Sequence, residues 1–246
     1  MLTGAHLTKI AKNGVAILDD VSVEVPSGKV VAVIGPSGAG KTTLVRTLSL
    51  LDPPDSGVVV VDGSAEYRYP LARTTKPPAS PWPDVTVVFQ SLFLFPHLTL
   101  RENILLPARR EARNTRTASM APLVESLDLV QVLDRYPSEA SLGQQQRAAL
   151  VRALALRPRY LLLDEVTSAL DVEQVGAVTR VLFDAARSGV GILVVTHLLG
   201  FARRVAERFL FMDHGRILEA GSAEMLQRPN HPRVAEFLAQ ATGIGP

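Results

Sequence analysis

Three short segments of the chain are apolar at every position and are followed by polar residues. They span residues 30–34 (VVAVI), 160–163 (YLLL) and 192–195 (ILVV). A strand with one face in water alternates apolar and polar residues, whereas a strand covered on both faces does not. The three segments therefore predict an α/β fold, with a parallel sheet that is covered by helices on both faces.

The regions between these strands have a different pattern. Residues 67–83 carry prolines at positions 70, 77, 78, 81 and 83, and proline excludes a central strand or a helix. We expect a loop or an edge of a sheet there. Residues 91–139 alternate apolar patches with an arginine-rich stretch, ARREARNTRTASM at 108–120, and follow a helical period. They predict a mostly helical insert.

The polar segment SLGQQQR, residues 141–147, opens a helical pattern that ends at Arg157 and Pro158. Ser141 and Gln144 have the spacing of a capping box, in which two side chains satisfy free backbone N–H groups. A capped helix start also attracts anions, because its N–H groups and its dipole present positive charge. The residues alone leave open whether the segment is only a cap or part of a binding site.

Composition narrows the class of protein. The 246 residues are 47% hydrophobic and 20% charged, which suits one large domain or two closely joined ones. A net charge of +2 does not indicate nucleic-acid binding. The absence of cysteine excludes disulfides and Cys-ligated zinc and is typical of a reducing compartment. Neither a signal peptide nor an uninterrupted apolar run of about 18 residues is present, so we expect a membrane role only through partners.

The first strand leads into a glycine-rich loop. Residues 35–42 fit the pattern G-x-x-x-x-G-K-[ST] at every fixed position, between a strand and a helix. Such a loop surrounds phosphate with backbone N–H groups, Lys41 adds positive charge, and the Thr42 hydroxyl can bind Mg²⁺. A glycine-rich turn with a surface lysine is the weaker alternative. The predicted nucleotide-binding residues are Gly35, Pro36, Ser37, Gly38, Ala39, Gly40, Lys41, Thr42 and Thr43.

Acidic residues follow the second strand. Asp164 is the candidate ligand for phosphate-bound Mg²⁺. Glu165, beside it, is placed to accept a proton from attacking water, because burial and neighbouring charges can tune its pKa. Gln90 and His197 follow apolar segments as well but carry no prediction alone. Since no N-K-x-D or T-K-x-D pattern for guanine is present, the sequence favours hydrolysis of ATP.

Taken in order, these segments resemble the ATP-binding cassette of ABC transporters over nearly the whole chain. GPSGAGKTT resembles Walker A, VVFQ the Q-loop, and SLGQQQRAALVRAL the signature segment with its helix. LLLDE resembles Walker B, SALD the D-loop, and VVTH the switch histidine. The tail DHGRILEAGSAEMLQRPNHPRVAEFL resembles the end of importer cassettes that serve polar amino acids.

The resemblance implies a P-loop NTPase fold with a mostly parallel core sheet, an antiparallel β subdomain and a helical insert. Residues 1–90 would form the first part of the ATP-binding core with the antiparallel subdomain, and 140–222 its second part. Residues 91–139 would form the helical subdomain and 223–246 a C-terminal helical tail.

It also implies that ATP and Mg²⁺ lie between two cassettes arranged head to tail. Each ATP would contact one Walker A and the other subunit's Ser141, Gly143 and Gln144, with Asp171 shaping the seam. Gln90 would sense the metal and the attacking water, and His197 would contact the γ-phosphate. The implied catalytic residues are Glu165, His197 and Gln90, and the implied metal ligands are Thr42, Gln90 and Asp164.

The partners implied are a second, identical ATPase subunit, integral membrane permease subunits and a solute-binding protein, with no nucleic acid. The place implied is the cytoplasmic face of the cell membrane. Residues 91–103, SLFLFPHLTLREN, resemble the segment that meets the permeases. Phe93, Phe95 and Pro96 could equally serve an ordinary helix core.

Two positions depart from the family pattern. Leu142 stands where the signature has its first glycine, and its Cβ narrows the backbone conformations open to it. We therefore expect a working but weaker contact between subunits. No aromatic residue precedes Tyr67, although the family stacks adenine on one near residues 10–15. Aliphatic contact must substitute, at a cost of roughly 1 kcal/mol.

The expected function is an ATPase subunit that energises the import of a polar amino acid or a similar small solute. An exporter ATPase is an alternative, since only the tail and the FPHLT segment favour import. A non-transport cassette that acts as a binding module is another. Such relatives usually carry two cassettes, long coiled coils or cysteine-rich zinc insertions, and this sequence has none of these.

Overall fold

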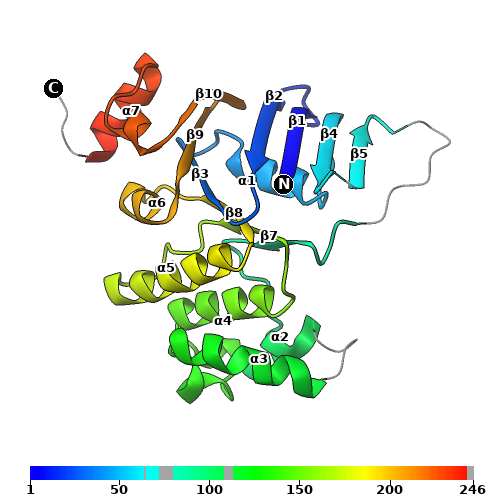
Figure 1. Ribbon diagram of the computed structural model, residues 1–246, viewed down its shortest axis with the longest axis vertical. Coiled ribbons are helices and arrows are strands. Elements are labelled where there is room, and N and C mark those ends of the chain that lie inside the picture. The colour runs from blue at the N-terminus through cyan, green and yellow to red at the C-terminus, as the bar shows by residue number, and fades with distance from the viewer. Residues whose placement is uncertain (64, 72–79, 108–112, 243–246) are drawn as a thin grey trace.

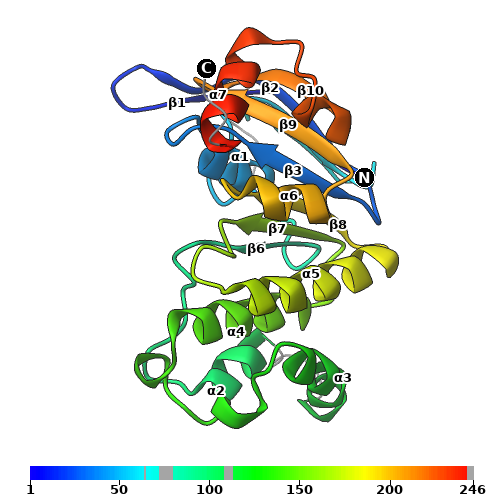
Figure 2. The same cartoon turned by 90° about the vertical axis from the view of Figure 1, so that its left-hand side faces the viewer.

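Two β-sheets and a group of helices make up the chain in the computed structural model, which describes residues 1–63, 65–71, 80–107 and 113–242. Figures 1 and 2 show the helical insert at the opposite end of the molecule from the antiparallel sheet, with the larger sheet between them. The chain crosses between these parts several times, so that segments far apart in sequence meet at the larger sheet.

The larger sheet has six strands in the order β10-β9-β3-β8-β7-β6. Five are parallel and β10 runs antiparallel to β9. The strands are β3 (Val30–Ile34), β6 (Val85–Val88), β7 (Tyr160–Asp164), β8 (Gly191–Val195), β9 (Arg208–Asp213) and β10 (Arg216–Gly221). All residues of β3, β7 and β8 are buried. The strands predicted from the three apolar segments, and their parallel pairing, are confirmed.

The smaller sheet is antiparallel, with the order β2-β1-β4-β5. Its strands are β1 (Leu2–Ile10), β2 (Ala16–Val25), β4 (Ser56–Val61) and β5 (Ala65–Tyr69). Burial mostly alternates along β2, as expected of a sheet with one face in water. The first residues of the proline-rich region therefore lie in an edge strand, one of the two predicted alternatives, and residues 72–79 lie outside the described part of the chain.

Helices and the smaller sheet cover the two faces of the larger sheet. On one face, α4 (Leu142–Leu154) and α5 (Val172–Arg187) pack on alternate residues of β7 and β8. On the other face, α1 (Lys41–Leu48) and the antiparallel sheet bury the remaining residues of these strands. A third cluster joins β9 to α6 (Leu199–Val205), η4 (Ala223–Leu226) and α7 (Pro232–Thr242). Together these features confirm the predicted P-loop NTPase fold.

The insert holds α2 (Leu100–Leu105), α3 (Arg113–Ser126) and the short 3₁₀ helices η2 (Val130–Val132) and η3 (Pro137–Glu139). Buried Asn103 donates through Nδ2 to the carbonyls of Phe95, Leu98 and Thr99, so one side chain fixes the irregular segment before α2. Most of the described insert is helical, as predicted, and residues 108–112 lie outside the described part. Within the described residues, no helix is both long and apolar enough to span a bilayer.

Candidate functional site

Four parallel strands end along one edge of the larger sheet, and each is followed by residues singled out in the sequence. β3 leads into the phosphate loop and β7 ends at Asp164, while β8 and β6 lead to His197 and Gln90. Because these strands are adjacent in the order β3-β8-β7-β6, their carboxyl ends meet at the same edge. Ligands of open α/β sheets bind at such an edge.

Packing explains two of the glycines in the phosphate loop. A Cβ added to Gly35 would lie 2.0 Å from the Met212 carbonyl oxygen, and one added to Gly40 would lie 2.6 Å from the Ile17 carbonyl oxygen. Both residues also have positive φ angles, 147° and 97°, a region that favours glycine. The loop is therefore wedged between β9 and β2, so its backbone has little room to move.

Lys41 is folded into this loop and not extended into solvent. Its side chain is 7% exposed, and Nζ donates to the carbonyl oxygens of Gly35 at 2.9 Å and Pro36 at 2.7 Å. Burial lowers the pKa of Lys41, while the carboxylates of Glu165, Asp164 and Asp213 oppose that shift. A buried ammonium inside a loop of backbone N–H groups suits a polyphosphate, and the surface-lysine alternative is excluded.

Asp164 faces this loop from the end of β7. It is 3% exposed, and its Oδ1 has no hydrogen-bond partner in the described part of the chain. Burial raises the pKa of Asp164, as does Glu165, whereas a hydrogen bond with Thr42 and the charges of Lys41 and Arg46 lower it. Mg²⁺ is commonly held by one or two carboxylates together with substrate phosphates. The carboxylate and the Thr42 hydroxyl fit that ligand set.

Glu165 and His197 lie together beside Asp164. The distance between His197 Nδ1 and Glu165 Oε1 is 3.4 Å, and Glu165 is the less exposed of the two. Glu165 has a φ of 53°, while its N–H donates to the Val195 carbonyl oxygen at 2.9 Å. A non-glycine residue held at positive φ carries strain that clusters at functional sites. The backbone thus directs this carboxylate toward the strand edge.

Gln90 is exposed two residues beyond β6. Its neighbour Phe89 forms two contacts that tie this segment to the rest of the site. The guanidinium of Arg46, on α1, lies 5.5 Å from the centre of the Phe89 ring, a cation–π contact. The rings of Phe89 and Phe93 meet edge to face at 5.8 Å. The segment after β6 therefore joins the phosphate-loop helix to the insert.

Ser141 is the N-cap of α4, and both halves of the predicted capping box are present. The Gln144 N–H donates to Ser141 Oγ at 3.2 Å, and the Ser141 N–H donates to Gln144 Oε1 at 2.9 Å. Leu142 is the first residue of the helix and has no positive φ, with a 54% exposed side chain. Leucine adopts this helical backbone without strain, and the expected weakening of the contact between subunits stays a prediction.

The signature helix packs closely against the SALD segment. A Cβ on Gly143 would lie 2.8 Å from Gln174 Oε1 and 3.2 Å from the Ala169 carbonyl oxygen. Asp171 caps α5 by accepting from the Gln174 N–H at 2.8 Å. The helix starts of α4 and α5 therefore lie side by side. They belong to helices that cover the opposite face of the sheet from α1.

Sequence reasoning from the residues missed one wall of the phosphate loop, the turn that joins β9 to β10. In this turn the Gly215 N–H donates to the Ala39 carbonyl oxygen at 3.1 Å, and the Asp19 N–H donates to the Gly215 carbonyl oxygen at 2.9 Å. The available signal was a buried strand, FLFMD, followed by a glycine turn.

Near the expected adenine position, the aliphatic residues Ile10 and Val15 are 49% and 61% exposed.

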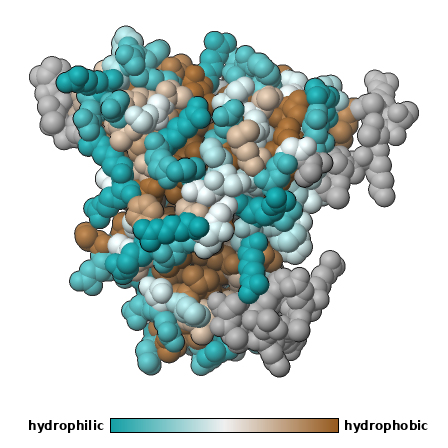
Figure 3. Space-filling view, viewed as in Figure 1, coloured by the Kyte–Doolittle hydropathy of each residue, from teal (hydrophilic) through white to brown (hydrophobic). Residues whose placement is uncertain are grey.

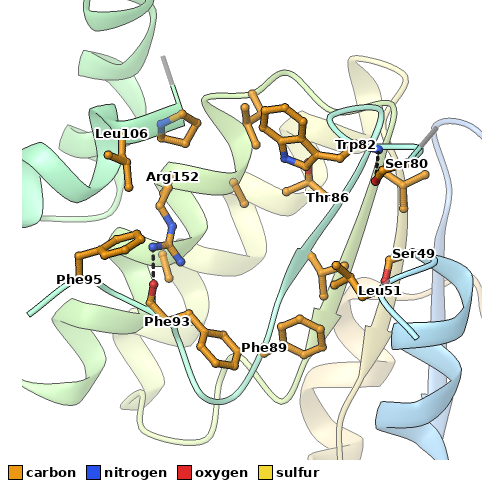
Figure 4. Close-up of a pocket in the computed structure, with 16 residues that line it drawn as sticks. Ser49, Leu51, Ser80, Trp82, Thr86, Phe89, Phe93, Phe95, Leu106 and Arg152 are labelled. Atoms are coloured by element: carbon orange, nitrogen blue, oxygen red, sulfur yellow. Dashed lines mark hydrogen bonds between the residues drawn. The ribbon is translucent and has the colours of Figure 1, made fainter. Parts of the chain in front are cut away.

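A second feature is an apolar groove of about 400 Å³ between the larger sheet and the insert. Figure 4 shows Trp82, Phe89, Phe93 and Phe95 around it, with Arg152 of α4 reaching across. Arg152 donates to the Phe93 carbonyl oxygen at 2.8 Å and the Leu92 carbonyl oxygen at 2.6 Å. The space-filling view shows hydrophobic surface over the helical lower half of the molecule (Figure 3).

Comparison with known proteins agrees with this geometry. A family model described as ABC transporter matches residues 18–168. A glutamate transport ATP-binding protein of Corynebacterium efficiens is 40% identical, over 91% of this chain and 92% of the relative. An L-cystine transport system ATP-binding protein of Escherichia coli is 41% identical over 92% of each chain, and a glutamine transport ATP-binding protein of the same species is 40% identical over 90% and 92%.

Solved structures show the same fold. The dimeric structure of MJ0796, a bacterial ABC transporter cassette, has a TM-score of 0.77 at 29% identity and covers 90% of this chain and 98% of that one. A post-hydrolysis dimer of MJ0796 bound to ADP and Pi has a TM-score of 0.76 at the same identity, with the same coverage of both chains. Because the family model covers more than half of the chain and relatives about 40% identical cover nine tenths of it, the chain belongs to the ABC transporter family and is one of its ATPase cassettes.

Proposed function

We propose that this ATPase energises the transport of a polar amino acid through a membrane permease, and that it works as a pair of identical subunits. The observation that carries the proposal is the strand edge where three features meet: Lys41, the Oδ1 of Asp164, which has no partner among the described residues, and the pair Glu165–His197. The relatives named for glutamate, cystine and glutamine transport support the solute class.

The site residues have four proposed roles. The phosphate loop from Gly35 to Thr43 would bind the phosphates, while Thr42, Asp164 and Gln90 would hold Mg²⁺, which would neutralise phosphate charge when bound. Glu165 accepts the proton of the attacking water, and His197, 3.4 Å away, contacts the γ-phosphate. A positioned base of this kind contributes about 10²–10⁴-fold to rate.

The second subunit completes the site. In each chain, α4 packs on the face of the sheet opposite to α1, so Ser141 and the helix of its own phosphate loop belong to opposite faces. Ser141, Gly143 and Gln144 would therefore meet the ATP of a second copy, with Asp171 at the seam. The dimeric MJ0796 structures support this arrangement.

The groove in Figure 4 would receive the permease. It is lined largely by aromatic and aliphatic side chains, and contiguous exposed apolar surface is typical of sites of protein contact. The proposed structural units are a core at 1–90 and 140–222, an insert at 91–139 and a tail at 223–246. Docking on a permease would hold the chain at the cytoplasmic membrane face, with a solute-binding protein outside.

The ATPase assignment and the dimer are tested by Glu165→Gln. With Mg²⁺ and ATP, this variant should elute as a dimer on size exclusion, and hydrolysis should fall about 10²–10⁴-fold. Ser141→Arg should prevent dimer formation in the Glu165→Gln background while each monomer still binds ATP. A Glu165→Gln protein that neither dimerises nor loses hydrolysis would refute both the base and the paired site.

Transport is tested by purification from detergent-solubilised membranes. Recovery with multi-span permease subunits, followed by ATP-dependent uptake of labelled glutamate, cystine or glutamine into vesicles, is the expected result. Recovery with ribosomes or DNA instead would replace the transport proposal with a non-transport role. Efflux from loaded vesicles without uptake would reverse the proposed direction.

A further inference from the structure

The turn between β9 and β10 is held by three parts of the chain. Its Gly215 N–H donates to Ala39 of the phosphate loop at 3.1 Å. On the other side, Arg216 pairs with Asp19 of β2 at 2.6 Å. Just before the turn, the Met212 carbonyl lies so close to Gly35 that no Cβ would fit. A shift of this turn would therefore move the backbone that surrounds the phosphates.

The third contact comes from the C-terminal helix. Arg233, the second residue of α7, donates through Nε to Asp213 Oδ2 at 2.8 Å and through Nη1 to Glu236 Oε2 at 2.9 Å. The Asp213 side chain is only 5% exposed, and its Oδ1 accepts from the His214 N–H at 2.9 Å. Figures 1 and 2 show α7 lying beside β9 and β10. One carboxylate thus joins α7 to the turn.

This ion pair is separate from the contacts that anchor α7. The helix packs through Val234 and Leu238 in a cluster with Phe211 of β9, and the rings of Phe237 and Phe211 meet at 5.1 Å. Apolar burial already explains why the helix docks. A buried carboxylate without its cation would be strongly destabilising at that spot. The pair with Arg233 therefore acts on the turn and the phosphate loop more than on the helix.

Charge links the same carboxylate to the nucleotide. Asp213 is one of the three acids that oppose the lowering of the Lys41 pKa by burial. Asp213 thus lies close enough to act on the phosphate-binding lysine as well as on Arg233. A shift of Asp213 would therefore change its interaction with both Lys41 and Arg233.

We propose that Arg233 is a positioning residue for nucleotide binding, which acts through Asp213 to hold the β9–β10 turn against the phosphate loop. The inference rests on the proposed role of that loop in binding ATP. It adds a contribution from the C-terminal tail, which supplies none of the site residues predicted from the sequence.

The test is Arg233→Gln in the full-length chain. Affinity for Mg²⁺ with a non-hydrolysable ATP analogue, measured by calorimetry, should weaken about fivefold. KM for ATP should rise by a similar factor while kcat changes less than about twofold, because the loss is one of binding. Arg233→Lys should restore most of the affinity, since an ammonium can still pair with Asp213.

Two matched variants separate positioning from helix docking. Phe237→Ala should lower Tm without changing the affinity, because Phe237 does not touch Asp213. Glu236→Gln should leave both unchanged, because the glutamine oxygen can still accept from Arg233 Nη1 and the pair of Arg233 with Asp213 remains. Equal affinity in Arg233→Gln and the wild type would overturn the inference, and so would an equal loss in Phe237→Ala. If Arg233→Gln does not fold, Asp213→Asn, which removes the charge and keeps only one of the two acceptor oxygens, must show the same weakening. A wild-type chain that binds no nucleotide would overturn this inference and the proposed site together.

Discussion

Asp164 and Lys41 are charged groups that the folded chain buries before any ligand arrives. Asp164 Oδ1 lacks a hydrogen-bond partner among the described residues, and the pKa of Lys41 is lowered by burial. Glu165 adds a positive φ angle next to them. Each of these features costs stability in the empty protein. Phosphates and Mg²⁺ would pair with the two buried charges, so ligand binding should stabilise the fold.

Replacing Asp164 with asparagine should raise the stability of the nucleotide-free protein. The amide removes a buried charge and keeps the shape, for a gain of roughly 1 kcal/mol, which corresponds to about 2–4 °C in Tm. ATP hydrolysis should fall by more than about 100-fold, because the metal ligand is gone. Calorimetry and phosphate release measure the two effects.

Asp171→Asn is the matched control for this change. Asp171 is an exposed N-cap, and asparagine caps a helix as well as aspartate does, so Tm should stay the same. A lower Tm in Asp164→Asn would contradict the claim that this carboxylate is an unfavourable charge in the empty site.

The raised pKa of Asp164 also predicts a pH dependence. Burial raises this pKa above 3.8, so on acidification the folded chain takes up this proton before the unfolded chain does. This group therefore adds stability to the empty protein as pH falls toward 3.8, and that gain is lost as pH rises through the folded pKa. The proton competes with Mg²⁺, so the Mg²⁺ concentration for half-maximal ATPase should increase as pH falls.

The measurement is a Mg²⁺ titration of ATPase activity from about pH 8 to about pH 5. The Tm of the nucleotide-free protein should be followed over the same pH range. In Asp164→Asn it should no longer show the gain in stability that this carboxyl group gives as pH falls. A Mg²⁺ requirement that stays constant down to the lowest pH would show that Asp164 is not the group that competes.

At the scale of elements, the pattern of apolar and polar residues identified a strand where burial on both faces was the main determinant of its sequence. β3, β7 and β8 are buried on both faces, so their unbroken apolar runs identified them. β1 could not be recognised in the same way, because its register shifts between Gly4 and Leu7 and between Leu7 and Lys9 break the period of two. The antiparallel sheet was expected only from the family resemblance.

The candidate site likewise contains residues that a local sequence pattern predicts and contacts that no local pattern predicts. Gly35 to Thr42, Asp164 and Ser141 follow from local chemistry, and the structure places them as the local patterns suggest. The contact of Gly215 with Ala39 and that of Arg233 with Asp213 join residues far apart in sequence. No local pattern determines such a pair, because it arises only when β9 has been placed beside β3.

The packing of α4 on the SALD segment predicts the effect of Gly143→Ala. The added Cβ would lie 2.8 Å from Gln174 Oε1 and 3.2 Å from the Ala169 carbonyl oxygen, so the Gln174 side chain must move and the Ala169 backbone must shift by a few tenths of an ångström. Overpacking of this kind costs about 1–3 kcal/mol. Tm should fall accordingly, and ATP-dependent dimer formation in the Glu165→Gln background should weaken.

Leu142→Gly is the control, and it restores the glycine that is usual at this position in the family. Leu142 already has helical backbone and an exposed side chain, so dimer formation should change less than about twofold, with a small loss of Tm from glycine. A large gain of dimer in Leu142→Gly would show that the leucine side chain obstructs the partner.

At the scale of the whole molecule, the nucleotide edge and the apolar groove share one segment. Gln90 follows β6 at the nucleotide edge, and three residues later Phe93 lines the groove. Arg46 contacts Phe89, Phe89 contacts Phe93, and Arg152 holds the Phe93 carbonyl. These contacts form a continuous path of packed side chains from the phosphate-loop helix to the groove.

Phe93→Asp should separate the two functions. Phe93 is 63% exposed with a φ of 48°, a conformation that aspartate tolerates well, so the change places a charge in the groove without backbone strain. Recovery of permease subunits should fall at least about tenfold, as expected for a buried unpaired charge, while the isolated chain still binds ATP. Phe183→Asp, on α5 away from the lining residues and 38% exposed, should leave permease recovery intact. If both variants lose permease equally, the groove is not the docking surface, and Phe93 matters only for the fold.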